Sequence, residues 1–265
     1  MKITTWNVNS LRVRLPQVLT WLQTNPVDIL GIQETKLVDA KFPTAEIAQA
    51  GYDVVFAGQP TYNGVALLTR RDTIASVTDV VTNNPDFPDE QARLITATCD
   101  GLRICCAYVP NGQDVESDKY GYKLAWLDAL AGWLGKGAGA PGKPLVLLGD
   151  FNIAPADADV HDPVAWEGKV LCSAPERARF AQLLALGLVD SFRQFDQPEK
   201  IYSWWDYRQL GFRRNAGLRI DHVLVARPLL AALRGCSVDK APRKWEKPSD
   251  HAPVTACFER AALPG

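Results

Sequence analysis

Short apolar runs of β-strand length are the feature that most limits what this chain can fold into. Each run is four to eight residues long and is bounded by Gly, Pro, Asn or Asp. The eleven runs lie at residues 3–6, 27–32, 53–56, 65–69, 74–81, 94–98, 102–108, 145–148, 201–205, 220–225 and 254–258. The strands between 53 and 108 follow one another directly, as in a meander. This pattern does not suit a simple alternating β-α-β sheet, and it predicts a mixed two-sheet α/β sandwich.

Helical periodicity appears in three segments. Residues 15–22 and 124–134 carry Leu or Val at the spacing of one helix face. The third segment begins at Ser173 and has Glu176 three residues later, which is the spacing of a capping box. We therefore expect a few helices between some of the strands.

Bulk composition sets wider limits. The chain has 265 residues, 47% hydrophobic and 22% charged, which suits a single domain spanning 1–265 and, by default, a monomer. A net charge of −1 excludes a broadly basic nucleic-acid binder but leaves room for a local basic patch. The N-terminus has no signal-peptide pattern, and no run of about 18 apolar residues occurs. We expect a cytoplasmic protein with no membrane partner.

The six cysteines form no C-x-x-C pair. This spacing excludes zinc-ribbon and thioredoxin-like sites. It favours buried free thiols in a reducing compartment.

Acids and amides stand at the ends of several apolar runs. A carboxylate buried at a strand end costs free energy unless it is paired or binds a metal. One such residue alone is typical of a turn, but the strand ends of α/β sheets gather at one rim and build sites there. Seven polar residues next to predicted strands together favour a functional site: Asn7, Glu34, Asp150, Asn152, Asp221, Asp250 and His251.

The ligand types indicate the metal. Carboxylate and amide oxygens suit Mg²⁺ or Mn²⁺ better than Zn²⁺. Only three histidines are present and no H-E-x-x-H motif occurs, so a zinc hydrolase is not expected. Magnesium held by oxygen ligands points to phosphoryl chemistry.

A glycine-rich segment at 137–143 is close to a phosphate-binding P-loop. Its sequence is G-x-x-x-x-G-K, but Pro144 stands where Ser or Thr is required. The segment also joins a predicted helix to a predicted strand, the reverse of a P-loop. We reject a nucleotide site here.

Basic and aromatic residues interleave in the segment 203–219. Four arginines accompany one acid, Asp206, and four aromatic side chains. Arginine binds phosphates, and aromatic rings stack on bases or fill an unstacked position. No base-reading motif is present, so the segment favours recognition of a nucleic-acid backbone rather than of sequence.

Eight motifs cover nearly the whole chain in one order. They are TTWNVNSLR at 4–12, IQETK at 32–36, YNGVALLTR at 62–70, YVPNG at 108–112, LLGDFNIAP at 147–155, YSWWDYR at 202–208, GLRIDHVLV at 217–225 and PSDHAPV at 248–254. With these motifs the chain resembles the exonuclease III family of the endonuclease/exonuclease/phosphatase superfamily. The resemblance implies a four-layer α/β sandwich, with two facing mixed sheets flanked by helices, like deoxyribonuclease I. It also implies a Mg²⁺-dependent DNA-repair nuclease.

The resemblance further implies a role for each site residue. Glu34 would hold Mg²⁺, for which Mn²⁺ can substitute, with Asn7 and Asp250 nearby. Asp150 would position or deprotonate the attacking water, or donate a proton to the leaving group. The remaining roles concern the phosphate and the water: His251 contacts the phosphate, Asp221 orients His251, Asn152 places the water and Tyr108 binds phosphate.

The expected substrate is double-stranded DNA with abasic sites, nicks or blocked 3′ ends. Trp204, Leu218 and Ile220 would line a pocket for a baseless sugar, and Tyr207 and Arg208 would lie on a loop that enters the groove. Four more residues are candidates for backbone contact: Arg12, Lys36, Tyr62 and Asn111.

Two departures leave alternatives open. Asn9 stands where some relatives carry Asp near the metal, which puts a second metal position in doubt. Residues 157–169 lie where the family varies, so the balance of exonuclease, 3′-phosphatase and abasic endonuclease activity stays open. The chain could also be a phosphoesterase of the same superfamily with a non-DNA substrate, or an inactive DNA-binding module.

Overall fold

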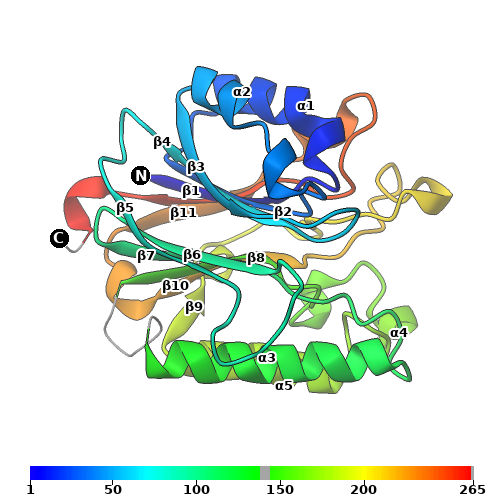
Figure 1. Cartoon of the computed structure of the whole chain (residues 1–265). Helices are drawn as coiled ribbons and strands as arrows, with labels where there is room; N and C mark the ends of the chain where they lie inside the picture. Colours follow the sequence, from blue (N-terminus) through cyan, green and yellow to red (C-terminus); the bar gives the residue numbers. More distant parts are fainter. Residues whose placement is uncertain (138–143, 264–265) are drawn as a thin grey trace.

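The chain folds into four layers (Figure 1). The computed structural model describes residues 1–137 and 144–263. Two six-stranded mixed sheets face each other, with helices on the outer face of each. The predicted sandwich of two mixed sheets flanked by helices is confirmed.

The helices and strands have the following bounds. The helices are α1 (Leu11–Thr24), α2 (Thr44–Gln49), α3 (Asp118–Lys136), α4 (Pro163–Trp166) and α5 (Ala174–Ala185). The strands are β1 (Lys2–Asn7), β2 (Ile29–Gln33), β3 (Tyr52–Ala57), β4 (Val65–Arg70), β5 (Val77–Thr82), β6 (Leu94–Cys99), β7 (Leu102–Tyr108), β8 (Leu145–Asp150), β9 (Leu188–Asp190), β10 (Asp221–Ala226), β11 (Leu233–Val238) and β12 (Val254–Phe258).

The central strands of each sheet are buried on both faces, whereas the edge strand β5 is largely exposed. The first has the order β11-β12-β1-β2-β4-β3, and the second β5-β6-β7-β8-β10-β9. Ile29, Leu67 and Val146 belong to the core between the sheets. Central strands such as β2 and β8 are buried along their whole length. Two covered faces explain why these strands are continuous apolar runs in the sequence.

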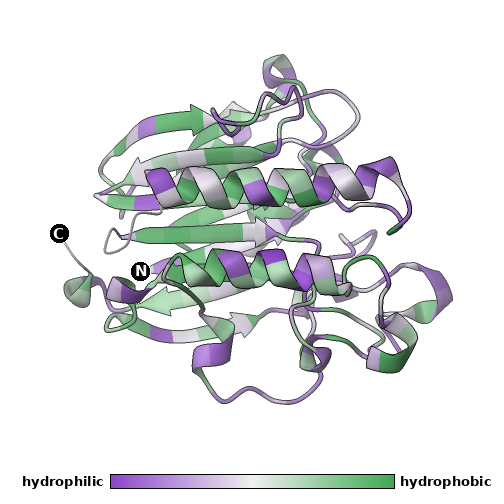
Figure 2. Cartoon of the chain, turned by 90° about the horizontal axis from the view of Figure 1, so that it is seen from below, coloured by the Kyte–Doolittle hydropathy of each residue, from purple (hydrophilic) through white to green (hydrophobic). Residues whose placement is uncertain are grey.

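The outer helices cover the sheets with their apolar faces. Val18 and Leu22 of α1 pack over the first sheet, and Leu127 and Leu130 of α3 pack over the second. Seen from below, α3 and α5 lie side by side across that sheet (Figure 2). The capping-box prediction is supported, because the Glu176 carboxylate accepts from the backbone N–H of Ser173 at 3.1 Å.

The topology places the ends of three strands at one end of the sandwich. In Figure 1, β1 and β8 run away from the chain termini, and β2 is parallel to β1. Strand β10 begins at that end, because it is antiparallel to β8 and pairs Asp221 with Asp150. The polar residues at these strand ends therefore meet at one rim.

Three strand predictions were wrong. Residues 201–205 form no strand: Trp204 makes only isolated bridges to Leu218 and His251, and the buried Tyr202 and Trp205 account for the apolar pattern. The run 74–81 is strand only from Val77. The predicted meander is broken, because β4 and β5 lie in different sheets.

Two strands were missed. Strand β9 has only three residues, and the edge strand β11 carries a register shift between Leu233 and Gly235. Short or irregular edge strands give a weak sequence signal. Helix α2, of six residues, was also missed.

The rejected P-loop segment falls mostly at 138–143, outside the described residues. All six cysteines are free, and five are buried. Among the described residues, no helix has the length and apolar character needed to cross a membrane.

Candidate active site

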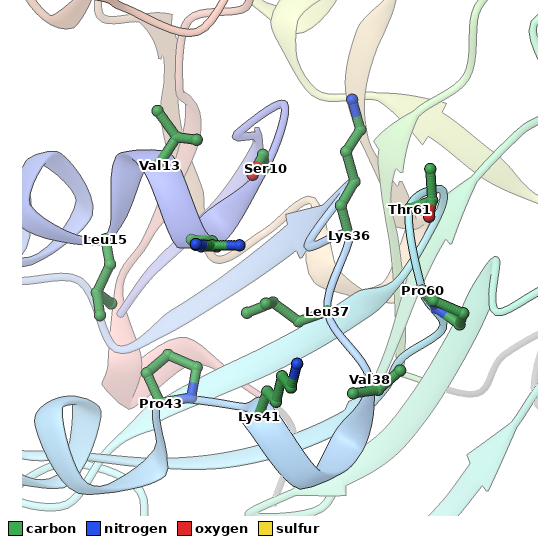
Figure 3. A pocket seen from close by; sticks show the side chains of 11 residues that line it. Ser10, Val13, Leu15, Lys36, Leu37, Val38, Lys41, Pro43, Pro60 and Thr61 are labelled. Carbon is green, nitrogen blue, oxygen red and sulfur yellow. The ribbon is translucent and has the colours of Figure 1, made fainter.

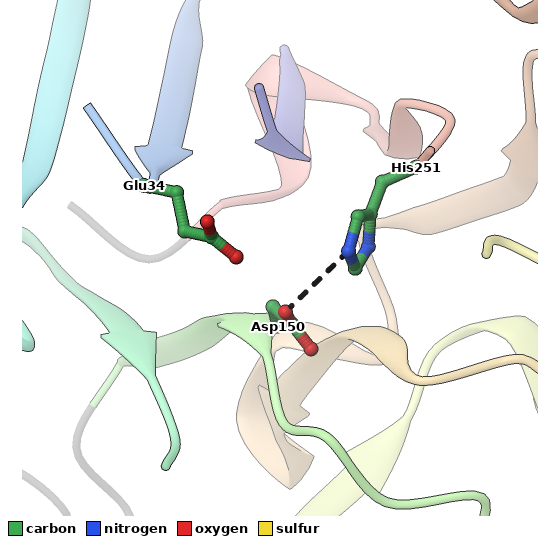
Figure 4. Close-up of side chains that lie close together, drawn as sticks. All are labelled: Glu34, Asp150 and His251. Carbon is green, nitrogen blue, oxygen red and sulfur yellow. Dashed lines mark ion pairs between the residues drawn. The ribbon is translucent and has the colours of Figure 1, made fainter. Parts of the chain in front are cut away.

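Glu34, Asp150 and His251 converge at the rim of the two sheets (Figure 4). Glu34 follows β2, Asp150 ends β8 and His251 precedes β12, so both sheets contribute. One ligand atom from each lies within 4.8 Å of the others. All three line a cavity of about 280 Å³.

Asp221 holds His251 in place. Its carboxylate oxygens lie 2.9 and 3.1 Å from His251 Nδ1, and its side chain is fully buried. Ser203 Oγ donates to Asp221 Oδ2 at 2.6 Å, which fixes the carboxylate. The other imidazole nitrogen, Nε2, then lies 3.7 Å from Asp150 Oδ2.

This arrangement keeps the imidazole charged. Burial alone would lower the pKa of His251, but the carboxylates of Asp221 and Asp150 outweigh it and raise this pKa to about 10. Burial raises the pKa of Asp150, and the nearby His251 opposes that effect. At neutral pH His251 is an imidazolium that faces the cavity.

Glu34 is held by three neighbours. Its Oε1 accepts from Asn7 Nδ2 at 2.8 Å and from the Tyr108 hydroxyl at 2.9 Å, and its Oε2 lies 2.8 Å from Lys36 Nζ. Burial would raise the pKa of Glu34, but Lys36 and Asn7 outweigh it and lower the pKa. Burial, with Glu34 and Asp150 nearby, raises the pKa of Tyr108 well above its usual value. Tyr108 therefore remains a neutral donor.

Asn152 sits beside Asp150 in a left-handed turn with φ of 50°. Its backbone N–H donates to Asp150 Oδ1 at 2.9 Å, and its Nδ2 donates to Asp150 Oδ2 at 3.3 Å. Its Oδ1 accepts from Asn111 Nδ2 at 3.0 Å. The two amides and the carboxylate thus form one hydrogen-bonded edge of the cavity.

A buried ion pair that the sequence did not reveal supports this edge. Lys123 Nζ donates to the backbone carbonyls of Asn152 at 2.6 Å and Asn111 at 3.1 Å, and it pairs with Glu176. Both charged side chains are fully buried. The only sequence signal was a lysine within an otherwise apolar face of helix α3.

The donor set fits a magnesium ion. Glu34 and Asp150 offer carboxylate oxygens, the ligands that Mg²⁺ prefers. Asn7 directs its Nδ2 at both carboxylates, and its oxygen accepts from the Asn9 backbone N–H at 2.9 Å. As oriented, Asn7 orders the carboxylates rather than offering an oxygen.

Asp250, the third predicted metal residue, also lines the cavity. Its two oxygens accept from Asn9 Nδ2 at 2.9 Å and from Trp204 Nε1 at 3.0 Å. The three-residue cluster of possible ligands does not include it.

The cavity walls combine apolar and polar groups. Trp204, Ile220 and Arg208 line it, and so do Trp166 and Leu171, which were not predicted as site residues. Trp166 lies within the variable segment 157–169, which was the only sequence signal for it. The predicted pocket residue Leu218 is 0% exposed, belongs to the same apolar cluster as Ile220, and is not among the residues that line the cavity.

Tyr207 and Arg208, the residues predicted to lie on a loop that enters the groove, each contact a neighbouring residue of this chain. Arg208 is exposed and pairs with Asp206 at 2.6 Å. The Tyr207 hydroxyl donates to the Pro248 carbonyl at 2.7 Å, while half of its side chain is exposed.

The remaining DNA-contact candidates lie in two flanking cavities. Arg12 and Lys36 line a groove of about 1020 Å³ together with Lys41 (Figure 3). Tyr62 and Asn111 line a cavity of about 610 Å³ that shares Tyr108 and Asn111 with the catalytic cavity. The candidates are therefore divided between two cavities and do not form one cluster.

Comparison with known proteins gives the family. Residues 4–251 match the Endonuclease/Exonuclease/phosphatase family. The chain belongs to this family. It is 34% identical to Exodeoxyribonuclease III of Haemophilus influenzae, over 98% of this chain and all of that protein. The predicted resemblance to exonuclease III, and with it the prediction of a nuclease, is confirmed.

Solved structures in this family have the same fold. A 3′ phosphatase from Neisseria, bound to a product DNA hairpin, matches with a TM-score of 0.93 and 50% identity, covering 97% of this chain and 99% of that one. An AP endonuclease from Archaeoglobus fulgidus matches with a TM-score of 0.92 and 39% identity, covering 98% and 99%. The roles of individual site residues remain predictions.

Proposed function

We propose that this chain, as one domain, is a Mg²⁺-dependent DNA-repair nuclease that acts chiefly at the 3′ ends of double-stranded DNA. The observation that carries the proposal is the meeting of Glu34, Asp150 and the charged His251 in one cavity. The likeness to a 3′ phosphatase at 50% identity supports the choice of 3′ ends.

Each residue of the site would have a separate role in the hydrolysis of a phosphodiester. Glu34 would hold Mg²⁺, which would supply positive charge against the phosphate oxygens when bound; Mn²⁺ can replace it. His251, kept protonated by Asp221, would stabilise the negative charge that develops on the phosphate. The Tyr108 hydroxyl would bind a phosphate oxygen as a neutral donor.

Asp150 and Asn152 would act on the attacking water. Burial raises the pKa of Asp150, which makes its carboxylate a better proton acceptor. The Asn152 amide, fixed by its neighbours, would orient the water without adding charge. We therefore assign Asp150 to the attacking water.

The cavity walls suit a sugar at the end of a strand. Trp166, Leu171, Trp204 and Ile220 supply apolar surface, and the volume of about 280 Å³ leaves little room around a sugar phosphate. Trp166 is one of the residues that line this cavity, and we infer that a terminal nucleotide or terminal phosphate enters it more easily than an uninterrupted strand. Abasic sites and nicks remain candidate substrates.

One labelled duplex in three forms tests the proposal: with a 3′-phosphate at a nick, with a recessed 3′-hydroxyl, and with a central abasic-site analogue. Each is incubated with Mg²⁺ or with EDTA. We expect metal-dependent removal of the 3′-phosphate to be fastest and abasic cleavage to be slowest.

The other outcomes separate the alternatives. Fastest cleavage at the abasic site would contradict the preference for 3′ ends. Binding of all three duplexes without reaction would indicate an inactive DNA-binding module. Neither binding nor reaction, with hydrolysis of a small phosphate ester, would indicate a non-DNA phosphoesterase.

A further inference from the structure

Arg243 is a charged side chain buried among aromatic rings, away from the lining of the catalytic cavity. Only 6% of it is exposed. Its guanidinium carbon lies 5.7 Å from the ring centre of Trp205, 5.6 Å from that of Tyr207 and 5.0 Å from that of Phe212. A cation over the face of an aromatic ring is attracted by the ring. Arg243 therefore holds together three rings of the segment 205–212, which includes the residues predicted to enter the DNA groove.

The same guanidinium contacts the loop that carries His251. Arg243 Nη1 donates to the backbone carbonyl of Ser249. The Ser249 hydroxyl in turn accepts from the backbone N–H of His251 at 3.2 Å and donates to the backbone carbonyl of Asn7 at 2.7 Å. Arg243 is therefore connected to the backbone of two site residues through one serine.

The two segments that Arg243 contacts also touch each other directly. The backbone N–H of Trp205 donates to the carbonyl of Asp250 at 3.1 Å. A displacement of the segment 205–212 would therefore also displace the loop 248–251. Because Arg243 contacts both segments, it restricts their relative movement.

The stability of the fold does not by itself account for a charge at this place. The guanidinium is buried, and its Nε has no hydrogen-bond partner among the residues that the structure describes. An apolar side chain of similar length would fill the space without leaving a buried donor unpaired. Arginine alone supplies a planar group that meets aromatic rings with its faces and a carbonyl with its edge. The geometry of Arg243 is therefore the property that an apolar side chain could not replace.

We propose that Arg243 is a positioning residue that couples the segment 205–212, where duplex DNA would bind, to the loop that carries His251. It does not line the catalytic cavity, so it would act through Ser249 and the aromatic rings. Because this role rests on the proposed function, a parent protein that cut none of the three labelled duplexes would overturn both. A parent that cut duplex DNA, with variants indistinguishable from it, would overturn only the role of Arg243.

Arg243→Met tests the coupling with two separate measurements. The dissociation constant for duplex DNA is measured by fluorescence anisotropy in EDTA, and kcat is measured with Mg²⁺ at saturating duplex. We expect the dissociation constant to rise about tenfold and kcat to fall about tenfold, because both contacts of the guanidinium are lost. An unchanged value of either would overturn the coupling. A purely structural role would lower the melting temperature and leave the dissociation constant of the folded protein unchanged.

Phe212→Leu tests the same contact from the other side and does not depend on the folding of the Arg243 variant. It removes the nearest of the three rings but keeps an apolar side chain. We expect the dissociation constant to rise about fivefold, and an unchanged value would overturn the role of the rings. Because both changes break one contact, the double variant is expected to bind no more weakly than the weaker of the two single variants. Single effects that multiply in the double variant would overturn the assignment.

Lys244→Met is the matched control for the loss of charge. Lys244 follows Arg243 in the short 3₁₀ helix Ala241–Lys244 and is exposed, so the variant removes an equal charge at the next position. We expect the dissociation constant and kcat to stay within about twofold of the parent, because an exposed charge is screened by salt. A change as large as that in Arg243→Met would show that overall charge is responsible, and would overturn the positioning role.

Discussion

The pairing of Asp221 with His251 allows a quantitative prediction. The fully buried Asp221 carboxylate lies 2.9 Å from His251 Nδ1. Two opposite unit charges about 4 Å apart attract each other by about 4 kcal/mol at the effective dielectric constant of such sites. A free-energy difference of about 1.4 kcal/mol between the two protonation states shifts a pKa by one unit. Asp221→Asn is therefore expected to bring the pKa of His251 from about 10 down to about 7.

NMR titration of the imidazole protons in EDTA measures this pKa directly. The chain has three histidines, so the His251 signals can be identified with a His251→Gln variant. Ser203→Ala is the matched control, because it removes the 2.6 Å hydrogen bond to Asp221 but leaves the charge. We expect that control to titrate as the parent does. An Asp221→Asn protein whose His251 still titrates near 10 would refute the electrostatic reasoning.

The same pKa has a consequence for stability. The folded-state pKa of His251, about 10, is above the ordinary value of 6.5. The stability that this group contributes is therefore fully present below pH 6.5 and is lost as the pH rises through about 10. Asp221→Asn should lose stability relative to the parent at pH 6, with a much smaller difference above pH 10.

Three further predictions concern the site and its surroundings. Lys123→Met leaves the Glu176 carboxylate buried without its partner, so the free energy of unfolding in urea should fall by about 3–5 kcal/mol. Trp166→Ala opens the cavity wall and should raise abasic-site cleavage relative to 3′-phosphate removal; an unchanged ratio would contradict its role. Glu34→Gln should lose at least about a hundredfold in Mg²⁺-dependent turnover while binding duplex DNA, measured by fluorescence anisotropy, within about threefold of the parent.

Much of the site could be predicted from the chain because its residues stand where apolar runs end. In a sheet buried on both faces, a strand is a continuous apolar run, and its last polar residue marks the rim. Glu34, Asp150, Asp221 and His251 were recognisable on that ground, and the structure brings them together. The eight motifs that follow one another along the chain indicated the family.

Other features depend on groups that are distant in sequence. Residues 201–205 have the composition of a strand, yet Tyr202 and Trp205 are buried in a loop against Ala252. Leu218 belongs to a recognisable motif, but the structure buries it in an apolar cluster with Ile220, and only Ile220 lines the cavity. The composition of a segment indicates that its side chains are buried, but it cannot indicate which residues they pack against.

The sequence by itself determined the class of fold, the chemistry of the site and its main acids and histidine, because local patterns record burial and strand ends. Only the tertiary structure decided how charge is distributed there. Lys123 meets Glu176, 53 residues away, and Lys36 reaches across a turn to both Glu34 and Asn9. Such contacts depend on distances between side chains of separate elements, and hydrophobic periodicity carries no record of those distances.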